Sequence, residues 1–264
     1  MQHPILVTAI RAARKAGDLI NRTIDRVAEL TVTSKAHNDY VTEVDRSAEA
    51  AIVEIIRRAY PQHGILAEEG STTPGKDFEW IIDPLDGTTN FIHGMPQVAV
   101  SIAVRHFDRI EHAVVYDPLR NELFSASRGG GAHLNDRRLR IAQRRDLEGA
   151  LLGTGFPFKD FSYLDAYLAT LRAIMPKVAG IRRPGSAALD LAYVAAGRYD
   201  GFWEFRLKPW DLAGGVLLVQ EAGGVVTDFH GEQDYWHSGN IVAGNMRIHA
   251  QLLRIIDEHG GDST

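Results

Sequence analysis

The stretch Trp80-Ile-Ile-Asp-Pro-Leu-Asp-Gly-Thr-Thr-Asn-Phe91 carries an apolar strand pattern straight into two aspartates. The apolar residues predict a strand that ends before Asp83, and open α/β folds place their sites where the chain leaves the sheet. Pro84 fixes the backbone locally, so the carboxylates of Asp83 and Asp86 and the Leu85 carbonyl can face one small volume. The stretch therefore predicts a cluster of oxygen ligands at the end of a strand.

The residues that follow Asp86 are suited to binding a phosphate. Gly87 permits close approach of the backbone, and Thr88-Thr89-Asn90 can begin a helix whose free N–H groups bind an anion. Carboxylates beside such N–H groups are typical of oxygen-ligated Mg²⁺ that holds a phosphate. Taken alone, the two aspartates are equally compatible with an Asx-type turn that ends a strand.

Three further acids point to the metal interpretation. Glu68 and Glu69 follow the short apolar stretch Gly64-Ile-Leu-Ala67, and adjacent glutamates repel each other unless a cation or solvent screens them. A solvated strand end remains open for Glu69. Asp211 begins an expected helix, where the positive end of the helix dipole favours the ionised carboxylate.

The composition excludes several other chemistries. The chain of 264 residues has no cysteine, which rules out disulfides, thiolate zinc sites, iron–sulfur clusters and cysteine nucleophiles. It also fits a reducing cytoplasm, which is where we expect the protein to act. We expect neither a signal peptide nor a membrane span, because no basic segment precedes an apolar one at the N-terminus and no apolar run is long enough. The 11 histidines show no HExxH spacing and no evident serine or aspartate partner, so we interpret them as surface or supporting residues.

The charge pattern offers little to nucleic acid. The net charge is −5, with 45% hydrophobic and 24% charged residues, as in ordinary soluble globular proteins. Arg137–Arg145 is the local exception, since Asn135–Arg145 holds five arginines. We interpret it as an exposed strand and turn, and a docking patch for an acidic partner or RNA stays open.

Periodicity predicts a layered α/β (α+β) protein without internal repeats. Two helices open the chain, over about 5–27 and 44–58, and strands follow at 64–67, 78–82, 98–104, 113–116 and 122–126. In the second half we expect strands at 149–153, 201–205 and 225–229, and helices at 164–175, 187–196 and 212–222. A soft boundary divides an N-terminal half, 1–147, which carries most metal ligands, from a C-terminal half, 148–264, which carries substrate contacts and Asp211.

Five motifs, taken in order and spacing, resemble those of the inositol monophosphatase family. They are Val41-Thr-Glu-Val-Asp45, Ala67-Glu-Glu69, Trp80–Phe91, Gly185-Ser-Ala-Ala188 and Trp210-Asp211, and they cover nearly the whole chain. The likeness to the bacterial branch known as extragenic-suppressor proteins rests on Ala12-Ala-Arg-Lys-Ala-Gly17, Gly155-Phe-Pro-Phe158 and Leu189–Gly197. The resemblance implies the five-layered αβαβα sandwich of the inositol monophosphatase and fructose-1,6-bisphosphatase superfamily, a homodimer and inhibition by lithium.

The resemblance also implies a metal site with two Mg²⁺ and a more weakly bound third. Glu68, Asp83 and the Leu85 carbonyl would hold the first ion, and Asp83, Asp86 and Asp211 the second. Glu68 would also help to place the third. Glu69 matches the second glutamate of the family and is assigned a supporting role.

Catalytic and substrate roles follow from the same resemblance. Thr88, paired with Asp45, would orient and help to deprotonate the attacking water, while Glu68 contributes through the metal. The substrate contacts would come from Asp86, Gly87, Thr88, Gly185, Ser186, Ala187 and Glu204. From the residues alone, Asp45 could be an ordinary helix N-terminal acid, Glu204 could pair with Arg206 or Lys208, and Gly185-Ser-Ala could be helix-start chemistry.

The expected function is Mg²⁺-dependent hydrolysis of myo-inositol 1-phosphate and related polyol monophosphates. Metal-bound water supplies a nucleophile near neutral pH, so no covalent nucleophile is required. Two alternatives stay open. The same chemistry could act on fructose 1,6-bisphosphate, a 3′-phosphoadenosine nucleotide or histidinol phosphate. Alternatively, the chain could be a regulatory partner of RNA polymerase in transcription antitermination, for which Arg137–Arg145 is the only local feature.

Overall fold

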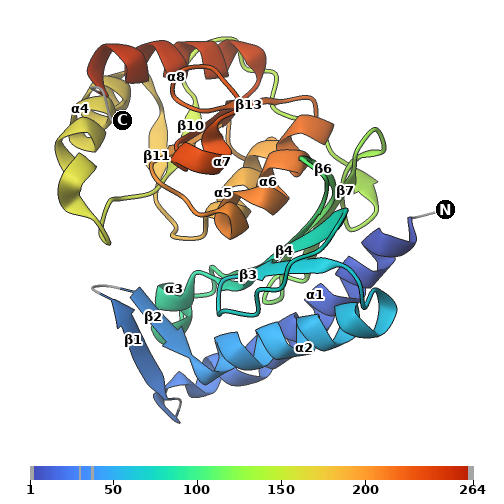
Figure 1. The fold of residues 1–264 in the computed structure, drawn as a ribbon. Coiled ribbons are helices and arrows are strands. Elements are labelled where there is room, and N and C mark those ends of the chain that lie inside the picture. Colours follow the sequence, from blue (N-terminus) through green and yellow to red (C-terminus); the bar gives the residue numbers. More distant parts are fainter. Residues whose placement is uncertain (1–2, 30, 37–38, 261–264) are drawn as a thin grey trace.

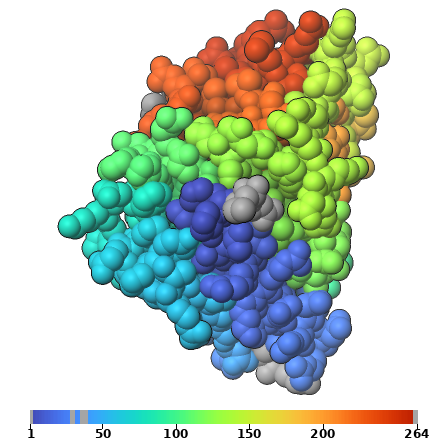
Figure 2. All heavy atoms as spheres, turned by 90° about the vertical axis from the view of Figure 1, so that its right-hand side faces the viewer, coloured from blue at the N-terminus to red at the C-terminus, as the bar shows by residue number. Residues whose placement is uncertain are grey.

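The computed structural model describes residues 3–29, 31–36 and 39–260, and it shows five stacked layers (Figure 1). From the N-terminal side these are a helix pair, a seven-stranded sheet, a second helix pair, a five-stranded sheet and a third helix pair. Viewed from the side, the N-terminal layer lies at one end of the molecule and the C-terminal helix at the other (Figure 2). The predicted αβαβα sandwich is confirmed.

The first layer forms because two amphipathic helices share one apolar face with the sheet. α1 (Pro4–Thr23) and α2 (Glu43–Ala59) bury alanine and isoleucine residues against the sheet in one core cluster. The first helix is shorter than expected, because after Thr23 the chain continues as a 3-10 helix, η1 (Ile24–Glu29). A hairpin of β1 (Val32–Ala36) and β2 (Asp39–Thr42), which the sequence did not predict, leads into α2.

The large sheet is antiparallel except for its first pair of strands. In spatial order it consists of β3 (Gly64–Ala67), β4 (Phe78–Asp86), β5 (Ala99–His106), β6 (Arg109–Asp117), β7 (Glu122–Ser127), β8 (Gly131–Leu134) and β9 (Arg137–Arg138). β3 and β4 are parallel, so their carboxyl ends lie at the same edge of the sheet. This arrangement brings Glu68 next to the end of β4.

The end of β4 differs from the prediction. The strand does not stop before Asp83 but continues to Asp86, with a bulge between Asp83 and Asp86 in its pairing with β5. On the other side, pairing with β3 ends at Ala67 and Ile82, so the continuation has no strand neighbour there. A proline is tolerated at such a bulge on a free edge, which explains why Pro84 does not end the strand.

The middle layer consists of two helices that are apolar all round. α5 (Ala187–Ala195) is buried at every position and α6 (Pro209–Glu221) at most positions. Such helices belong between two sheets, and both pack into the core cluster that joins the two. Their N-terminal ends carry Gly185–Ala187 and Asp211, as expected.

The remaining layers belong to the second half of the chain. The smaller sheet consists, in spatial order, of β11 (Gly180–Arg182), β10 (Leu151–Thr154), β12 (Gly201–Glu204), β14 (Ile241–Gly244) and β13 (Val225–Thr227). Its outer face is covered by α4 (Leu164–Ile174) and α8 (Met246–His259) (Figure 1). Short helices complete the chain: α3 (Thr88–Ile92), α7 (Tyr235–Ser238), η2 (Phe161–Tyr163) and η3 (Met175–Lys177). The sequence did not predict β8, β11, β14, α7 or α8, whereas β9 lies in the stretch that was expected to form an exposed strand and turn.

The strands of the two sheets fall on either side of residue 147, yet one core joins the halves, because α5 and α6 pack against the large sheet. The boundary at residue 147 stays a prediction.

In Arg137–Arg145 the arginines are exposed, while Leu139 and Ile141 between them are buried. In the described part of the chain, no helix has the length and apolar character that crossing a membrane requires.

Two of the histidines, which we interpreted as surface or supporting residues, are buried. His112 is buried on β6 with Nδ1 2.8 Å from Ser127 Oγ, and His249 is buried on α8 with Nε2 2.8 Å from Thr227 Oγ1. Neither of them lines the main cavity described next. Both therefore have serine or threonine partners that sequence spacing could not reveal.

Candidate active site

A cavity of about 690 Å³ lies where the end of β4 meets the N-termini of α3, α5 and α6. Eleven of the predicted site residues line it: Glu68, Asp83, Leu85, Asp86, Gly87, Thr88, Gly185, Ser186, Ala187, Glu204 and Asp211. Its volume is that of a pocket for a small molecule. Asp45 and Glu69 are not among the lining residues. Asp45 bonds to the lining residue Thr88, and Glu69 directly follows the lining residue Glu68.

Carboxylates from three separate segments converge on one side of this cavity. Asp83, Asp86 and Asp211 each offer an oxygen atom, and these atoms lie within 4.8 Å of one another. Glu68 joins them through a side-chain hydrogen bond with Asp83. Its backbone N–H donates to the Ile82 carbonyl at 3.1 Å, which fixes the end of β3 beside β4. The acids that the sequence placed at the ends of two strands and the start of a helix are therefore brought together.

Without a cation, these carboxylates repel one another too strongly for all of them to remain ionised. Burial, and then the charges of Glu68, Asp86 and Asp211, raise the pKa of Asp83 well above its ordinary value. Burial and the charge of Asp86 raise the pKa of Asp211 to about 7. Burial also raises the pKa of Asp86 to about 6, although two hydrogen bonds oppose this shift. An all-oxygen set of like charges fits a hard divalent cation such as Mg²⁺.

Short-range contacts hold these carboxylates in place. The Leu85 N–H donates to Asp83 Oδ1 at 3.0 Å, so the Asx-type turn considered as the alternative does exist, inside the acidic cluster. Asp86 Oδ2 accepts from the Ser186 hydroxyl at 2.6 Å and from the Ala188 N–H at 2.8 Å. The start of α5 therefore binds the Asp86 carboxylate.

Thr88 and Asp45 form the pair that the resemblance implied. The Thr88 hydroxyl donates to Asp45 Oδ1 at 2.9 Å and to the Leu85 carbonyl at 3.2 Å. Asp45 is also the N3 residue of α2, where its Oδ2 accepts from the backbone N–H of Thr42 at 2.8 Å and from its hydroxyl at 2.5 Å. Asp45 is therefore both a helix N-terminal acid and the partner of Thr88. Burial raises its pKa despite these hydrogen bonds.

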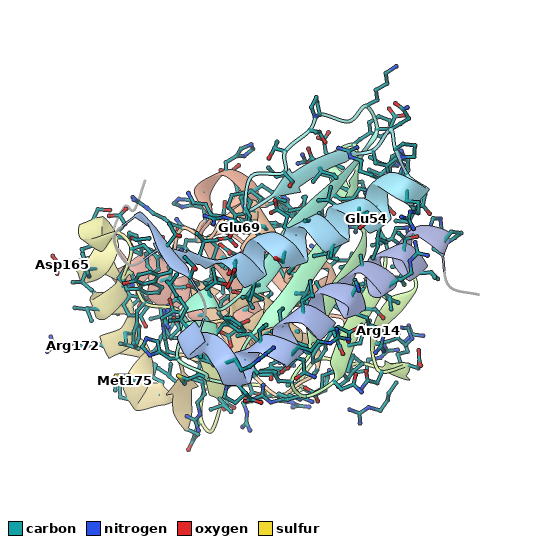
Figure 3. The ribbon with its side chains drawn as sticks, turned by 90° about the horizontal axis from the view of Figure 1, so that it is seen from below. Arg14, Glu54, Glu69, Asp165, Arg172 and Met175 are labelled. Atoms are coloured by element: carbon teal, nitrogen blue, oxygen red, sulfur yellow. The ribbon has the colours of Figure 1, made fainter. Side chains whose placement is uncertain are left out.

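A buried glutamate that the sequence did not single out supports the loop after β3. Glu49, on the buried face of α2, accepts from the Glu69 N–H at 2.7 Å and from the Ser71 N–H at 2.9 Å. Figure 3 shows Glu69 beside the N-terminal half of α2, which carries Glu49. Glu49 thereby fixes the backbone directly after Glu68. Its position on the buried face of an amphipathic helix, where an acid is unusual, was a readable signal.

The cavity is also lined by Glu204, at the end of β12. Burial raises the pKa of Glu204 to about 8, while the charges of Arg183 and Lys159 oppose that shift. The sequence offered Arg206 as an ion-pair partner of Glu204, but Arg206 pairs instead with Asp160 at 2.9 Å. Gly155 lies so close to Glu204 that a Cβ atom there would collide with the carboxyl group.

The loop before α5 is tied to α3 by one side chain. Asn90 Nδ2 donates to the Pro184 carbonyl at 2.8 Å and to the Gln97 carbonyl at 2.8 Å. Gly185 has a φ of +90° and Gly87 a φ of +97°, which are left-handed conformations that favour glycine. These two glycines bring the loop and the start of α3 together at the mouth of the cavity.

Comparison with known proteins finds relatives over nearly the whole chain. A family model described as "Inositol monophosphatase family" matches residues 1–260. A relative from Pseudomonas aeruginosa named "Nus factor SuhB" is 58% identical over 262 residues, which cover 97% of each chain. The crystal structure of the extragenic suppressor protein suhB from Bartonella henselae is 46% identical with a TM-score of 0.95, covering 97% of this chain and 99% of that one. The Thermotoga maritima IMPase is 38% identical with a TM-score of 0.89, covering 97% and 98%.

Proposed function

The chain belongs to the inositol monophosphatase family, and from that premise we propose that it hydrolyses myo-inositol 1-phosphate and related polyol monophosphates with the help of Mg²⁺. The observation that carries the proposal is the convergence of Asp83, Asp86 and Asp211 at the wall of a cavity suited to a small molecule. Gly87 and Thr88, which would bind the phosphate, and Glu204, which would bind the polyol, line the same cavity.

The acids would hold the metal ions in the arrangement that the sequence resemblance implies. Glu68, Asp83 and the Leu85 carbonyl offer one set of oxygen ligands, and Asp83, Asp86 and Asp211 offer another that shares Asp83. Bound Mg²⁺ would neutralise the phosphate dianion and lower the pKa of a coordinated water. Two ions and a weaker third, lithium inhibition and a homodimer remain predictions of the resemblance.

The side chains around the acids would position the water and the phosphate. Because Thr88 donates its only hydroxyl proton to Asp45 and the Leu85 carbonyl, its lone pairs face the cavity as acceptors for a water. As the water loses a proton to Thr88, the Thr88 proton can pass to Asp45, whose burial favours the protonated form. The N–H groups of Gly87 and Thr88 would bind phosphate oxygens, and Glu204 would bind the polyol.

The proposal is tested by measuring phosphate release from myo-inositol 1-phosphate with Mg²⁺ and with EDTA. Asp86→Asn should abolish turnover, because it removes a ligand while the amide oxygen keeps the bonds from Ser186 and Ala188. Glu54→Gln is the matched control, since Glu54 is an exposed acid on the outer side of α2 (Figure 3). Activity that survives chelation, or an Asp86→Asn enzyme as active as Glu54→Gln, would contradict the metal mechanism.

A substrate panel separates the polyol interpretation from the same chemistry on another ester. We expect higher kcat/KM for inositol phosphates than for fructose 1,6-bisphosphate, a 3′-phosphoadenosine nucleotide or histidinol phosphate. The reason is that Glu204, a hydrogen-bonding group for hydroxyls, lines the same cavity as the metal ligands. A strong preference for a nucleotide bisphosphate would overturn the substrate assignment but leave the metal mechanism intact.

A second candidate function is regulatory, and the name of the Pseudomonas aeruginosa relative, Nus factor SuhB, favours it. We propose that the chain also takes part in a transcription antitermination complex, with the exposed arginines of Arg137–Arg145 as a candidate contact. A pull-down with RNA polymerase and its elongation factors tests this, using wild type, Asp86→Asn and a variant with Arg137 and Arg138 changed to serine. Binding that is kept by Asp86→Asn and lost by the arginine variant would support it, whereas no capture by wild type would contradict it.

A further inference from the structure

One buried acid that lines the cavity has no role in the site described above. Asp190 lies on α5, one turn after the residues that bind Asp86, and it borders the cavity. Its side chain is only 1% exposed, and its Oδ1 has no hydrogen-bond partner among the described residues. Asp190 is therefore an almost fully buried polar group at the wall of the cavity, and its Oδ1 can still accept a hydrogen bond.

Such a group is unfavourable for the free protein. Burying a carboxyl group removes its hydration, and an oxygen without a donor recovers none of that loss. No lysine or arginine forms an ion pair with Asp190 among the described residues, so a structural salt bridge does not explain it. An unsatisfied polar atom beside a cavity points to a partner that arrives with the ligand.

Asp190 and Glu204 line the same cavity, and their charges interact. Apart from burial, the charges of Glu204 and then Asp86 are what raise the pKa of Asp190, and Arg183 opposes them. Arg183 likewise opposes the raised pKa of Glu204. Asp190 and Glu204 are thus two acids of the cavity that interact with the same cation, Arg183.

The side chain of Arg183 packs against two aromatic rings. The guanidinium of Arg183 lies 5.3 Å from the ring centre of Phe156 and 4.7 Å from that of Phe158, at distances typical of cation–π contact. Its Nε is also buried without a partner among the described residues. A planar cation fixed beside two acids leaves donors and acceptors facing the cavity together, which suits a ligand with hydroxyls on neighbouring carbons.

We propose that Asp190 is a specificity-determining residue, which binds one hydroxyl of the polyol while Glu204 binds its neighbour, so that the cavity selects phosphate esters of vicinal diols. The inference rests on the proposed phosphatase function and deepens it. The structural arrangement has a consequence for stability as well. Because Asp190 lacks a partner in the free protein, its replacement should not lower the melting temperature, whereas its contribution to substrate selection should be lost.

The test compares wild type with Asp190→Ala and Asp190→Asn on three kinds of substrate in the presence of Mg²⁺. These are myo-inositol 1-phosphate, its derivatives that lack one ring hydroxyl at a time, and p-nitrophenyl phosphate, which has no hydroxyl. Loss of a hydrogen bond to an acid should lower kcat/KM for inositol 1-phosphate about 10- to 100-fold in Asp190→Ala. The values for p-nitrophenyl phosphate should stay within about twofold of wild type, because that ester makes no such bond.

One deoxy derivative should identify the contact. If Asp190 binds a given hydroxyl, the derivative without it should be a poor substrate of wild type and insensitive to Asp190→Ala. Asp165→Asn is the matched control, because Asp165 is an exposed acid on α4 at the rim of the molecule and does not line the cavity (Figure 3). We expect this control to match wild type with every substrate.

Several outcomes would overturn the inference. Equal losses on inositol 1-phosphate and p-nitrophenyl phosphate, or no loss on either, would show that Asp190 does not select the polyol. A lower melting temperature of Asp190→Asn, with unchanged selectivity, would show a structural role. If Asp190→Ala does not fold, the same criteria apply to Asp190→Asn. A wild-type protein inactive on all substrates with Mg²⁺ would instead contradict the phosphatase function.

Discussion

Asp86→Asn should make the protein more stable without Mg²⁺ and less responsive to it, a crossed pattern that only a cation site produces. Two ionised carboxylates whose oxygens lie within 4.8 Å repel each other by about 3 kcal/mol at an effective dielectric constant of about 20. Asparagine removes one charge from the cluster of Asp83, Asp86 and Asp211. Its amide oxygen can keep both hydrogen bonds from the start of α5.

The expected shifts can be worked out for this chain. A ligand present at about 100 times its Kd stabilises the folded state by about 2.7 kcal/mol. With about 2.1 cal/mol/K of unfolding entropy per residue, a chain of 264 residues has about 0.55 kcal/mol/K, so Mg²⁺ should raise the wild-type Tm by about 5 °C. In EDTA, Asp86→Asn should melt about 2–5 °C above wild type, because part of the repulsion is gone. Its response to Mg²⁺ should be largely lost.

Thermal unfolding followed by circular dichroism near pH 7.5, in EDTA and across a Mg²⁺ titration, measures both shifts. Glu54→Gln serves again as the control, because it changes the net charge equally but lies outside the cluster. The reasoning fails if Asp86→Asn melts below wild type in EDTA, or if its Tm rises with Mg²⁺ as much as that of wild type. A rise shared by all three proteins would show that Mg²⁺ acts elsewhere.

Three more predictions follow from the same site. Thr88→Val should lower kcat about 100-fold, the usual contribution of a positioned proton acceptor, with little change in KM, which steady-state kinetics measures. Gly87→Ala should lower stability by about 1–3 kcal/mol and reduce activity, because φ is +97° and a Cβ atom would lie 2.8 Å from the Gln97 carbonyl oxygen; denaturant unfolding checks it. In EDTA, stability should fall as pH rises from about 4 to 7, because the folded pKa values of Asp86, about 6, and Asp211, about 7, lie above the ordinary value of 3.8. Folding then favours the protonated forms, and a Tm that rises over this range would contradict it.

The metal side of the site was predictable from the sequence because each ligand follows a local pattern. Glu68 comes directly after an apolar strand, and Asp211 begins a helix with proline in its first turn. Only the end of β4 was misjudged. Pro84 suggested the end of the strand, but the absence of a β3 neighbour beyond Ile82 allows the strand to continue, a feature of the sheet and not of the local sequence.

Among the elements that the sequence did not predict, α8 had a readable pattern and β14 did not. Asn245 caps α8, and its side chain accepts from the N–H groups of Arg247 and Ile248. With apolar residues buried along one face, this is an ordinary helix start and period. β14 has no comparable signal, since Ile241–Gly244 is short and buried on both faces, and such a run can be read as strand or helix.

The polyol side of the cavity was less predictable because its residues are far apart in the sequence. Asp190 looks like an ordinary polar residue of a helix, and only the packing of α5 between two sheets shows that it is buried at the cavity. Glu49 is a similar case on α2. In the sequence, Gly155-Phe-Pro-Phe158 indicated only a likeness to one bacterial branch. Only the structure shows that Gly155 packs against Glu204 and that the rings of Phe156 and Phe158 contact Arg183.

The cost of gathering so many acids is offset in part by where the helices begin. Asp45 lies at the third position of α2, Asp86 accepts from an N–H group at the start of α5, and Asp211 lies at the third position of α6. The positive ends of three helix dipoles are thus directed at carboxylates. Each helix end stabilises the ionised carboxylate by typically 0.3–1 kcal/mol, and by up to about 2 kcal/mol where the site is partly buried. Only the starts of α5 and α6 act on the cluster itself, and together they supply at most about 4 kcal/mol. Each of the three ionised pairs in the cluster repels by about 3 kcal/mol, so the helices keep the acids in position but cannot replace a cation. Asp190 lies a turn further along α5, without such an N–H partner. Its burial is therefore compensated least, which is why we expect its compensation to come from the substrate.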